Sequence, residues 1–166
     1  MEIEDITLKD IPPRTIVYLQ CNGSWRLLPE KIEKLDRHIS QTNLRAIGPA
    51  SGIYYNNPNE VSTEDLKWEV FYTVPTDTPE SSDDKSGIGI RNLPETKVAS
   101  IIHKGLYRKA GSSYEQLDEW IKNNGLKVCG PSEEVYISVF GVANEEQLME
   151  IRVPVSSIRG GFHDGS

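Results

Sequence analysis

The sequence predicts an α+β protein in which a strand–helix–strand–strand unit occurs twice, related by a pseudo-twofold axis. Three observations predict this class: an internal repeat, several short segments with alternating apolar residues, and one amphipathic helical pattern in each half. Neither half alone covers both faces of a sheet. We therefore expect one antiparallel sheet with both helices on a single face and a central cleft.

The internal repeat is the strongest signal. Sliding the chain along itself until Pro12 falls on Pro94 brings eleven identical pairs into one ungapped alignment, the repeat register, which also matches Gly23 with Gly105, Leu35 with Leu117, and Tyr54 with Tyr136. We expect a single domain over 1–166, with repeat halves at 1–75 and 87–155. Segment 76–86 is polar, acidic and rich in serine, which predicts a linker, and the glycine-rich end predicts a mobile tail at 156–166.

The first half begins with predicted strands at 2–8 and 14–20. A helix follows, with Pro29 in its first turn and Ile32, Leu35 and Ile39 along one face. Apolar stretches at 53–56 and 68–74 predict the two closing strands.

The second half repeats this order, with predicted strands at 87–91 and 96–103. The next helix has a predicted capping box, Ser112 with Glu115, and an apolar face that includes Leu117. Gly125 is a predicted C-cap, and strands are expected at 134–140 and 148–155.

Composition excludes several kinds of partner. The net charge of −7 disfavours nucleic acid, because phosphate binding needs a basic surface. Cys21 and Cys129 lie far apart, without a CxxC motif, so no metal and no cofactor is predicted. No apolar run approaches the roughly 20 residues that a membrane span needs, and the N-terminus does not look like a signal peptide. We therefore expect a cytoplasmic protein that does not contact membrane.

A glutamate stands in the closing strand of each half. In "MEIRVPV" apolar residues alternate with Glu150, Arg152 and Pro154, and Glu69 occupies the strand "WEVFYTVP". Aligning the glutamates or the prolines gives two registers of the same parity, so both keep the carboxylates on equivalent faces. We expect both to point toward the cleft. The alternative for Glu150 is an ion pair with Arg152 or a solvated face.

The second half resembles the GyrI-like small-molecule-binding family, which includes the effector-binding domains of AraC-type and MerR-type multidrug regulators. The resemblance rests on "HKGLY", "LDEWIKNNG", "GPSEEVY" and "MEIRVPV", with Leu106 where proline is usual. It implies a tandem repeat with an aromatic-lined cleft between the halves and a glutamate near its floor. Glu150 and Tyr107 match that pattern. The first half departs more, with "CNGSW" where the second has "HKGLY".

A carboxylate beside aromatic rings would suit a lipophilic cation, since each ring face adds about 0.5–2 kcal/mol. The candidate ligand-binding residues are Glu150, Glu69, Trp25, Tyr54, Trp68, Tyr107, Trp120 and Tyr136. For Trp120, simple packing of the helix on the sheet is the alternative. His103 has no nucleophile motif beside it, so a structural or pocket-rim role is expected.

The leading functional interpretation is a stand-alone small-molecule-binding protein that senses or sequesters lipophilic aromatic compounds, cations included, without binding DNA itself. The first alternative is a hydrolase of electrophilic toxic compounds, with Glu150 or Glu69 as general base; whether the protein is an enzyme stays open. The second is a protein-interaction module without a ligand, whose partner the sequence does not identify.

Overall fold

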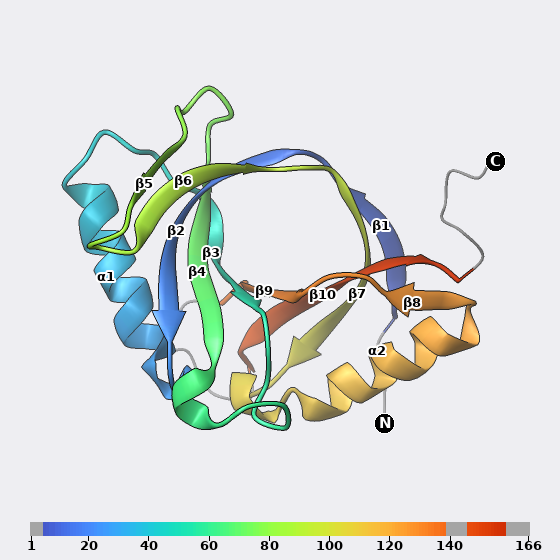
Figure 1. Ribbon diagram of the computed structural model, residues 1–166. Helices are drawn as coiled ribbons and strands as arrows, with labels where there is room; N and C mark the ends of the chain where they lie inside the picture. Colours follow the sequence, from blue (N-terminus) through green and yellow to red (C-terminus); the bar gives the residue numbers. More distant parts are fainter. Residues whose placement is uncertain (1–4, 139–145, 159–166) are drawn as a thin grey trace. The chain divides into compact units, whose positions relative to one another are not determined.

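The computed structural model describes residues 5–138 and 146–158 (Figure 1). The chain divides into two compact units. The first unit is Pro12–Glu95, and the second combines Met1–Ile11 with Thr96–Ser166. In the described part of the chain, no helix is both long enough and apolar enough to span a membrane.

The first unit is an antiparallel sheet with one long helix. Its strands are β2 (Arg14–Asn22), β3 (Ile47–Tyr54), β4 (Lys67–Val74), β5 (Ser81–Asp83) and β6 (Ile88–Leu93). Their order in the sheet is β3-β4-β2-β6-β5. Helix α1 (Leu28–Ser40) lies between β2 and β3 in the chain, and short 3-10 turns occupy Trp25–Leu27 and Thr63–Asp65.

The second unit repeats this plan. Its strands are β1 (Thr7–Ile11), β7 (Thr96–Lys104), β8 (Leu126–Val128), β9 (Ser132–Tyr136) and β10 (Leu148–Ser157). The order is β1-β7-β10-β9, and β8 pairs with the end of β10. A 3-10 turn at Tyr107–Lys109 precedes helix α2 (Gly111–Asn123). The predicted α+β class is therefore confirmed, with the described strands paired antiparallel.

The two repeats exchange their leading strands. Strand β1 precedes the first repeat but pairs with β7, whereas β6 precedes the second repeat but pairs with β2. The strand pairing is equivalent in both cases: Lys9 lies opposite Val98, and Arg91 lies opposite Ile16. The repeat register matches Lys9 with Arg91 and Ile16 with Val98. Each compact unit therefore contains the leading strand of the other sequence repeat.

Strand pairing also settles which residues of the closing strands correspond. Glu69 lies opposite Gln20, and Glu150 lies opposite Ile102, the residue that the repeat register matches with Gln20. The glutamates are therefore equivalent. The prolines are not, because Pro154 lies opposite Val98 and so corresponds to Thr73. The ungapped register would match Glu69 with Ile151, so the second repeat is one position shorter before its closing strand.

Each helix covers one face of its sheet. The Tyr72 hydroxyl of β4 donates to Asp36 of α1 at 2.6 Å, which places α1 on the Tyr72 face. The other face carries a buried apolar cluster of Ile16, Tyr18, Ile53 and Phe71. In the second unit His103 of β7 lies 3.1 Å from the Ser113 hydroxyl of α2, which places α2 on the His103 face.

The predicted helices form with small changes. Pro29 lies in the first turn of α1, and Ile32 and Leu35 are buried. Gly125 follows α2 with φ +70°, a conformation that favours glycine at a helix end. The predicted capping box is wrong, because α2 starts at Gly111 with Ala110 as N-cap and no side-chain cap. The preceding 3-10 turn continues directly into the helix and takes Ser112 into its first turn.

Several predicted boundaries also change, among them that of the strand expected at 53–56, which is β3 at Ile47–Tyr54. The first strand, expected at 2–8, is β1 at Thr7–Ile11, and 1–4 lie outside the described residues. The predicted linker 76–86 contains β5, which pairs with β6. In the predicted tail, 156 and 157 complete β10, and 159–166 lie outside the described residues. The strand expected at 134–140 is β9, ending at Tyr136, and 139–140 also lie outside them.

The equivalent helix positions Leu35 and Leu117, both fully buried, test the repeat energetically. Replacing either with alanine should lower the free energy of unfolding by about 2–5 kcal/mol, because each change removes buried methyl groups and leaves a cavity. Urea unfolding monitored by circular dichroism measures the loss. The exposed equivalents Glu33→Ala and Glu115→Ala are controls expected to change stability by about 0.5 kcal/mol or less. A Leu117→Ala variant as stable as its control would contradict the packing of α2.

Candidate functional site

Both predicted glutamates are buried on the sheet face that carries no helix. Side chains alternate along a strand, so Glu69 points away from α1, whose face holds Tyr72. Glu150 likewise points away from α2, because Met149 pairs with His103 on the helix side. Only 5% of Glu69 and 6% of Glu150 is exposed. Two ionisable groups thus lie in positions where an uncompensated charge is costly.

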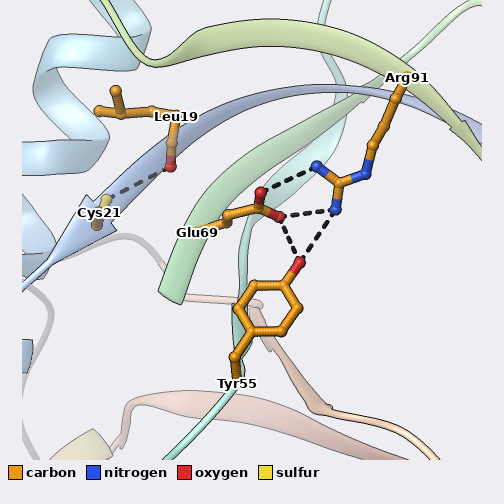
Figure 2. A network of polar contacts seen from close by, with 5 residues as sticks. All are labelled: Leu19, Cys21, Tyr55, Glu69 and Arg91. Atoms are coloured by element: carbon orange, nitrogen blue, oxygen red, sulfur yellow. Dashed lines mark hydrogen bonds and ion pairs between the residues drawn. The ribbon is translucent and has the colours of Figure 1, made fainter. Parts of the chain in front are cut away.

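Arg91 compensates Glu69 through a two-pronged ion pair (Figure 2). Arg91 Nη1 donates to Glu69 Oε2 at 3.0 Å, and Nη2 donates to Oε1 at 2.7 Å. The Tyr55 hydroxyl donates to the same Oε1 at 2.8 Å and accepts from Arg91 Nη2 at 3.2 Å. The guanidinium carbon lies 4.5 Å from the centroid of the Tyr18 ring. This closed network holds the carboxylate in one position.

Glu150 is compensated by two cations and one hydroxyl. Lys9 Nζ lies 2.5 Å and Arg152 Nε 3.1 Å from Oε2, and the Ser100 hydroxyl donates to Oε2 at 2.7 Å. The alternative of an ion pair with Arg152 therefore describes Glu150. Burial alone would raise the pKa of the Glu150 carboxyl, but the hydrogen bonds from Arg152, Lys9 and Ser100 outweigh it, so this pKa is lowered. The carboxylate stays ionised and is a weak base.

The ion pairs Arg91–Glu69 and Lys9–Glu150 occupy equivalent positions in the two repeats. Lys9 and Arg91 are equivalent in the repeat register, and each lies on an exchanged leading strand, β1 or β6. Each points its cation at the equivalent glutamate of β10 or β4. This relation was not predicted, although the repeat register aligns Lys9 with Arg91 directly.

A cavity of about 430 Å³ lies beside Glu69 in the first unit. Its lining residues come from the end of β2, the start of β4 and the residue after β3: Gln20, Cys21, Asn22, Tyr55, Lys67, Trp68 and Glu69. Tyr55 is 46% exposed, so its ring is accessible from solvent. Burial of its hydroxyl, together with the charge of Glu69, raises the pKa of Tyr55 to about 12. The hydroxyl therefore keeps its proton and remains a donor.

The first-half aromatic residues form a separate cluster. Trp25 packs edge-on against Tyr54 at 5.2 Å between ring centroids, and Tyr54 stacks on Trp68 at 6.1 Å. Trp68 Nε1 donates to the Gly23 carbonyl oxygen at 2.9 Å. Trp68 precedes Glu69 in β4, so the two side chains lie on opposite faces. Trp68 and Glu69 both line the cavity, but strand alternation turns the Trp68 side chain to the other face, and the aromatic residue bonded to the Glu69 carboxylate is Tyr55.

The second-half aromatic residues are also on the helix side. Tyr107 and Tyr136 lie 5.2 Å apart, and the Tyr107 hydroxyl donates to the carbonyl oxygens of Ser138 and Leu148. Tyr136 pairs with Met149 and not with Glu150, so strand alternation separates it from that carboxylate. Trp120 is half-buried on α2, the helix that packs against β7.

Glu134 of β9 is a further enclosed carboxylate, and it was not predicted as a site residue. Tyr114 and Tyr136 both donate to it, at 2.5 Å and 2.9 Å. Burial raises the pKa of Glu134, although these hydrogen bonds and the charge of His103 oppose the rise. Strand alternation could have placed it, since Glu134 shares a face with Tyr136. Its position between α2 and β9 indicates a structural link.

The environments of His103 and Cys21 fit structural roles. His103 Nδ1 lies 3.1 Å from the Ser113 hydroxyl and Nε2 lies 2.8 Å from the Leu106 carbonyl oxygen, so the ring ties β7 to α2. Burial raises the pKa of the Cys21 thiol to about 11, which leaves little thiolate at neutral pH. Among the described residues no group of three metal-ligating side chains could hold a metal ion.

Because the pKa of Glu150 is lowered by folding, its contribution to stability should be present above its ordinary value of about 4.5 and lost as pH falls below it. Glu150→Gln should therefore lower the free energy of unfolding by about 1–3 kcal/mol at pH 7 and by much less near pH 3. Urea unfolding at both pH values measures the difference, with the exposed Glu119→Gln as control. An equal loss at both pH values would show that the charge of Glu150 does not matter.

Comparison with known proteins identifies the family of this chain. Residues 4–156 match the model of the GyrI-like small molecule binding domain. A DNA gyrase inhibitor from Erwinia billingiae is 32% identical over 139 residues, covering 81% of this chain and 86% of that protein.

Two solved structures share the fold. The C-terminal domain of EcmrR superposes with a TM-score of 0.80 at 18% identity, covering 94% of this chain and 99% of that domain. The chain spans 58% of EcmrR in its DNA complex. SAV2435, solved with bound tetraphenylphosphonium, gives a TM-score of 0.58 at 16% identity, over 97% of this chain and 98% of that one. The family match over nearly the whole chain, together with the identity to the Erwinia protein, shows that this chain belongs to the GyrI-like small-molecule-binding family.

Proposed function

We propose that the protein binds lipophilic aromatic compounds, and that the cavity beside Glu69 and Tyr55 is a contact site for them. The cavity volume of about 430 Å³ lies within the range of roughly 300–1,000 Å³ typical of small-molecule sites. Such binding would serve either sensing of a compound or its sequestration. A cytoplasmic location and the lack of direct DNA binding remain predictions.

The exposed Tyr55 ring is the observation that carries this proposal. Its hydroxyl is held by Glu69 and Arg91, so the ring is fixed in orientation before a ligand arrives. A fixed aromatic face loses little conformational freedom on binding and offers a surface for stacking. The neighbouring Gln20, Asn22 and Lys67 add polar groups at the edge of the cavity. This mixture suits an aromatic compound with one polar group.

The comparisons support the same class of ligand. SAV2435, which shares the fold, is described with tetraphenylphosphonium, a compound of four phenyl rings around one centre. Its 16% identity transfers no residue contacts to this chain. The shared fold supports lipophilic, aromatic compounds as the first ligands to test.

Hydrolysis is less well supported by the chemistry of the site. A general base needs a pKa near the working pH, whereas the pKa of Glu150 is lowered by its three donors. Glu69 has its carboxylate oxygens bonded to Arg91 and Tyr55. The raised pKa of the Cys21 thiol disfavours it as a nucleophile. These groups suit binding better than turnover.

A protein partner is a second candidate function, because the Erwinia relative is named as a DNA gyrase inhibitor and is 32% identical. If this chain shares that property, purified protein should lower the supercoiling activity of gyrase in proportion to its concentration. A supercoiling assay with a closed circular plasmid measures this effect, with heat-denatured protein as control. Unchanged supercoiling at a large molar excess over gyrase would leave ligand binding as the proposed function.

Removal of the Tyr55 ring tests the ligand site. Tyr55→Ala should weaken binding of the neutral probe triphenylphosphine oxide about 5–30-fold, whereas Tyr55→Phe should retain most of the affinity, since the ring face is kept. Isothermal titration calorimetry measures the affinities. Trp25→Ala is the matched control, because Trp25 is also partly exposed but belongs to the aromatic cluster on the helix side. A larger loss in Trp25→Ala than in Tyr55→Ala would move the site to that cluster.

A further inference from the structure

We infer that Arg91 sets the charge preference of the Glu69 cavity, which as a result accepts neutral and anionic aromatic compounds in preference to cations of the same shape. This inference rests on the proposed binding function and specifies its ligand class. A buried glutamate beside an aromatic ring would by itself attract a cation. The contacts of Glu69 show why this one is a poor cation site.

The Glu69 carboxylate already accepts hydrogen bonds on both oxygens. Both oxygens of Glu69 receive hydrogen bonds from Arg91, at 2.7 Å and 3.0 Å, and Oε1 receives a further one from Tyr55. A ligand in the cavity meets a glutamate whose charge is already balanced. A cation would have to compete with a guanidinium that holds the carboxylate through two parallel bonds.

The Arg91 guanidinium is held rigidly by its neighbours. The Arg91 guanidinium lies 4.5 Å from the Tyr18 ring centroid on one side and is bonded to Tyr55 as well as Glu69. Gly89 lies opposite Tyr18 in β6, and a Cβ at Gly89 would clash with the Tyr18 hydroxyl. The backbone of β6 thus leaves space for the tyrosine ring on which Arg91 rests. Displacing Arg91 would disrupt several contacts together.

The charged side chains at the cavity also affect which ligands it accepts. Among the described residues that line it, Glu69 and Lys67 are charged, and Arg91 is paired with Glu69. These three side chains together carry one excess positive charge. Coulombic interaction in this partly buried setting therefore opposes a cation and favours an anion.

The pairing of a cation with the buried glutamate also occurs in the other repeat. The repeat position of Arg91 is occupied by Lys9, which forms an ion pair with one oxygen of Glu150 from the equivalent strand. In the repeat register Tyr18 and Tyr55 are replaced by Ser100 and Ile137. The internal cation is thus retained in both repeats while its surroundings differ, which indicates that charge balance of the glutamate is a built-in feature.

The experiment compares three probes of related shape and different charge: tetraphenylphosphonium, tetraphenylborate and triphenylphosphine oxide. Affinities are measured by calorimetry on the full chain, as wild type, Arg91→Met, Glu69→Gln and the Arg91→Met/Glu69→Gln double variant. Lys85→Met, an exposed position in the turn before β6, is the control for a change in net charge.

The wild type should bind tetraphenylborate more tightly than tetraphenylphosphonium. Arg91→Met should shift the ratio of the two affinities toward the cation by about tenfold or more, and Glu69→Gln should shift it a similar amount toward the anion. The double variant and Lys85→Met should keep the wild-type ratio. If Arg91→Met fails to fold because Glu69 is left unpaired, the opposite shift in Glu69→Gln still decides.

The outcomes separate the inference from the function on which it rests. If all three probes bind but the ratio is unchanged in both single variants, the charge inference is overturned and the binding function stands. A wild type that prefers tetraphenylphosphonium over tetraphenylborate also overturns it. If none of the probes binds the wild type, the proposed function fails, and the inference fails with it.

Discussion

The compensation of a buried carboxylate is the constraint on which both units depend. An ionised glutamate in the middle of a sheet strand costs several kcal/mol unless a cation and further donors accompany it. Glu69 and Glu150 meet this requirement with Arg91 of β6 and Lys9 of β1, which are separated from the strands of the glutamates by β2 and β7. A side chain of that length is needed because the two strands are not adjacent. Arginine and lysine are the long cationic side chains that can span it.

This requirement links the chemistry of the site to the topology. The cation must be delivered by the strand that pairs with β2 or β7, and in each unit this is the leading strand of the other repeat. Without β6, Glu69 would lose its bidentate partner, and without β1, Glu150 would lose Lys9. The exchanged strands therefore complete the charge balance as well as the sheets. A repeat half taken directly from the sequence would lack the strand that neutralises its own glutamate.

Sequence patterns predicted the local elements and missed the side-chain environment. Alternation in "MEIRVPV" correctly separates Glu150 from Met149 and Ile151, and of the two alignments left open for the closing strands, strand pairing supports the one that matches the glutamates. The same alternation argues against Trp68 as a neighbour of Glu69, because adjacent residues of a strand face opposite ways. The structure places Trp68 on that opposite face. The role of Arg91 depends on β6 pairing with β2, a contact between distant segments that no local pattern encodes.

The two units share a frame but offer different chemistry at the glutamate. Glu69 accepts a hydrogen bond from the Tyr55 hydroxyl, whereas the repeat register matches Tyr55 with Ile137, an exposed apolar side chain that cannot donate. Where Arg91 rests on Tyr18, the equivalent Ser100 donates directly to Glu150. Glu69 is thus balanced by one rigid arginine and an aromatic donor, whereas Glu150 is balanced by a flexible lysine, Arg152 and a hydroxyl. Because a fixed aromatic face and a cavity lie beside Glu69, the proposed function assigns ligand contact to the first unit.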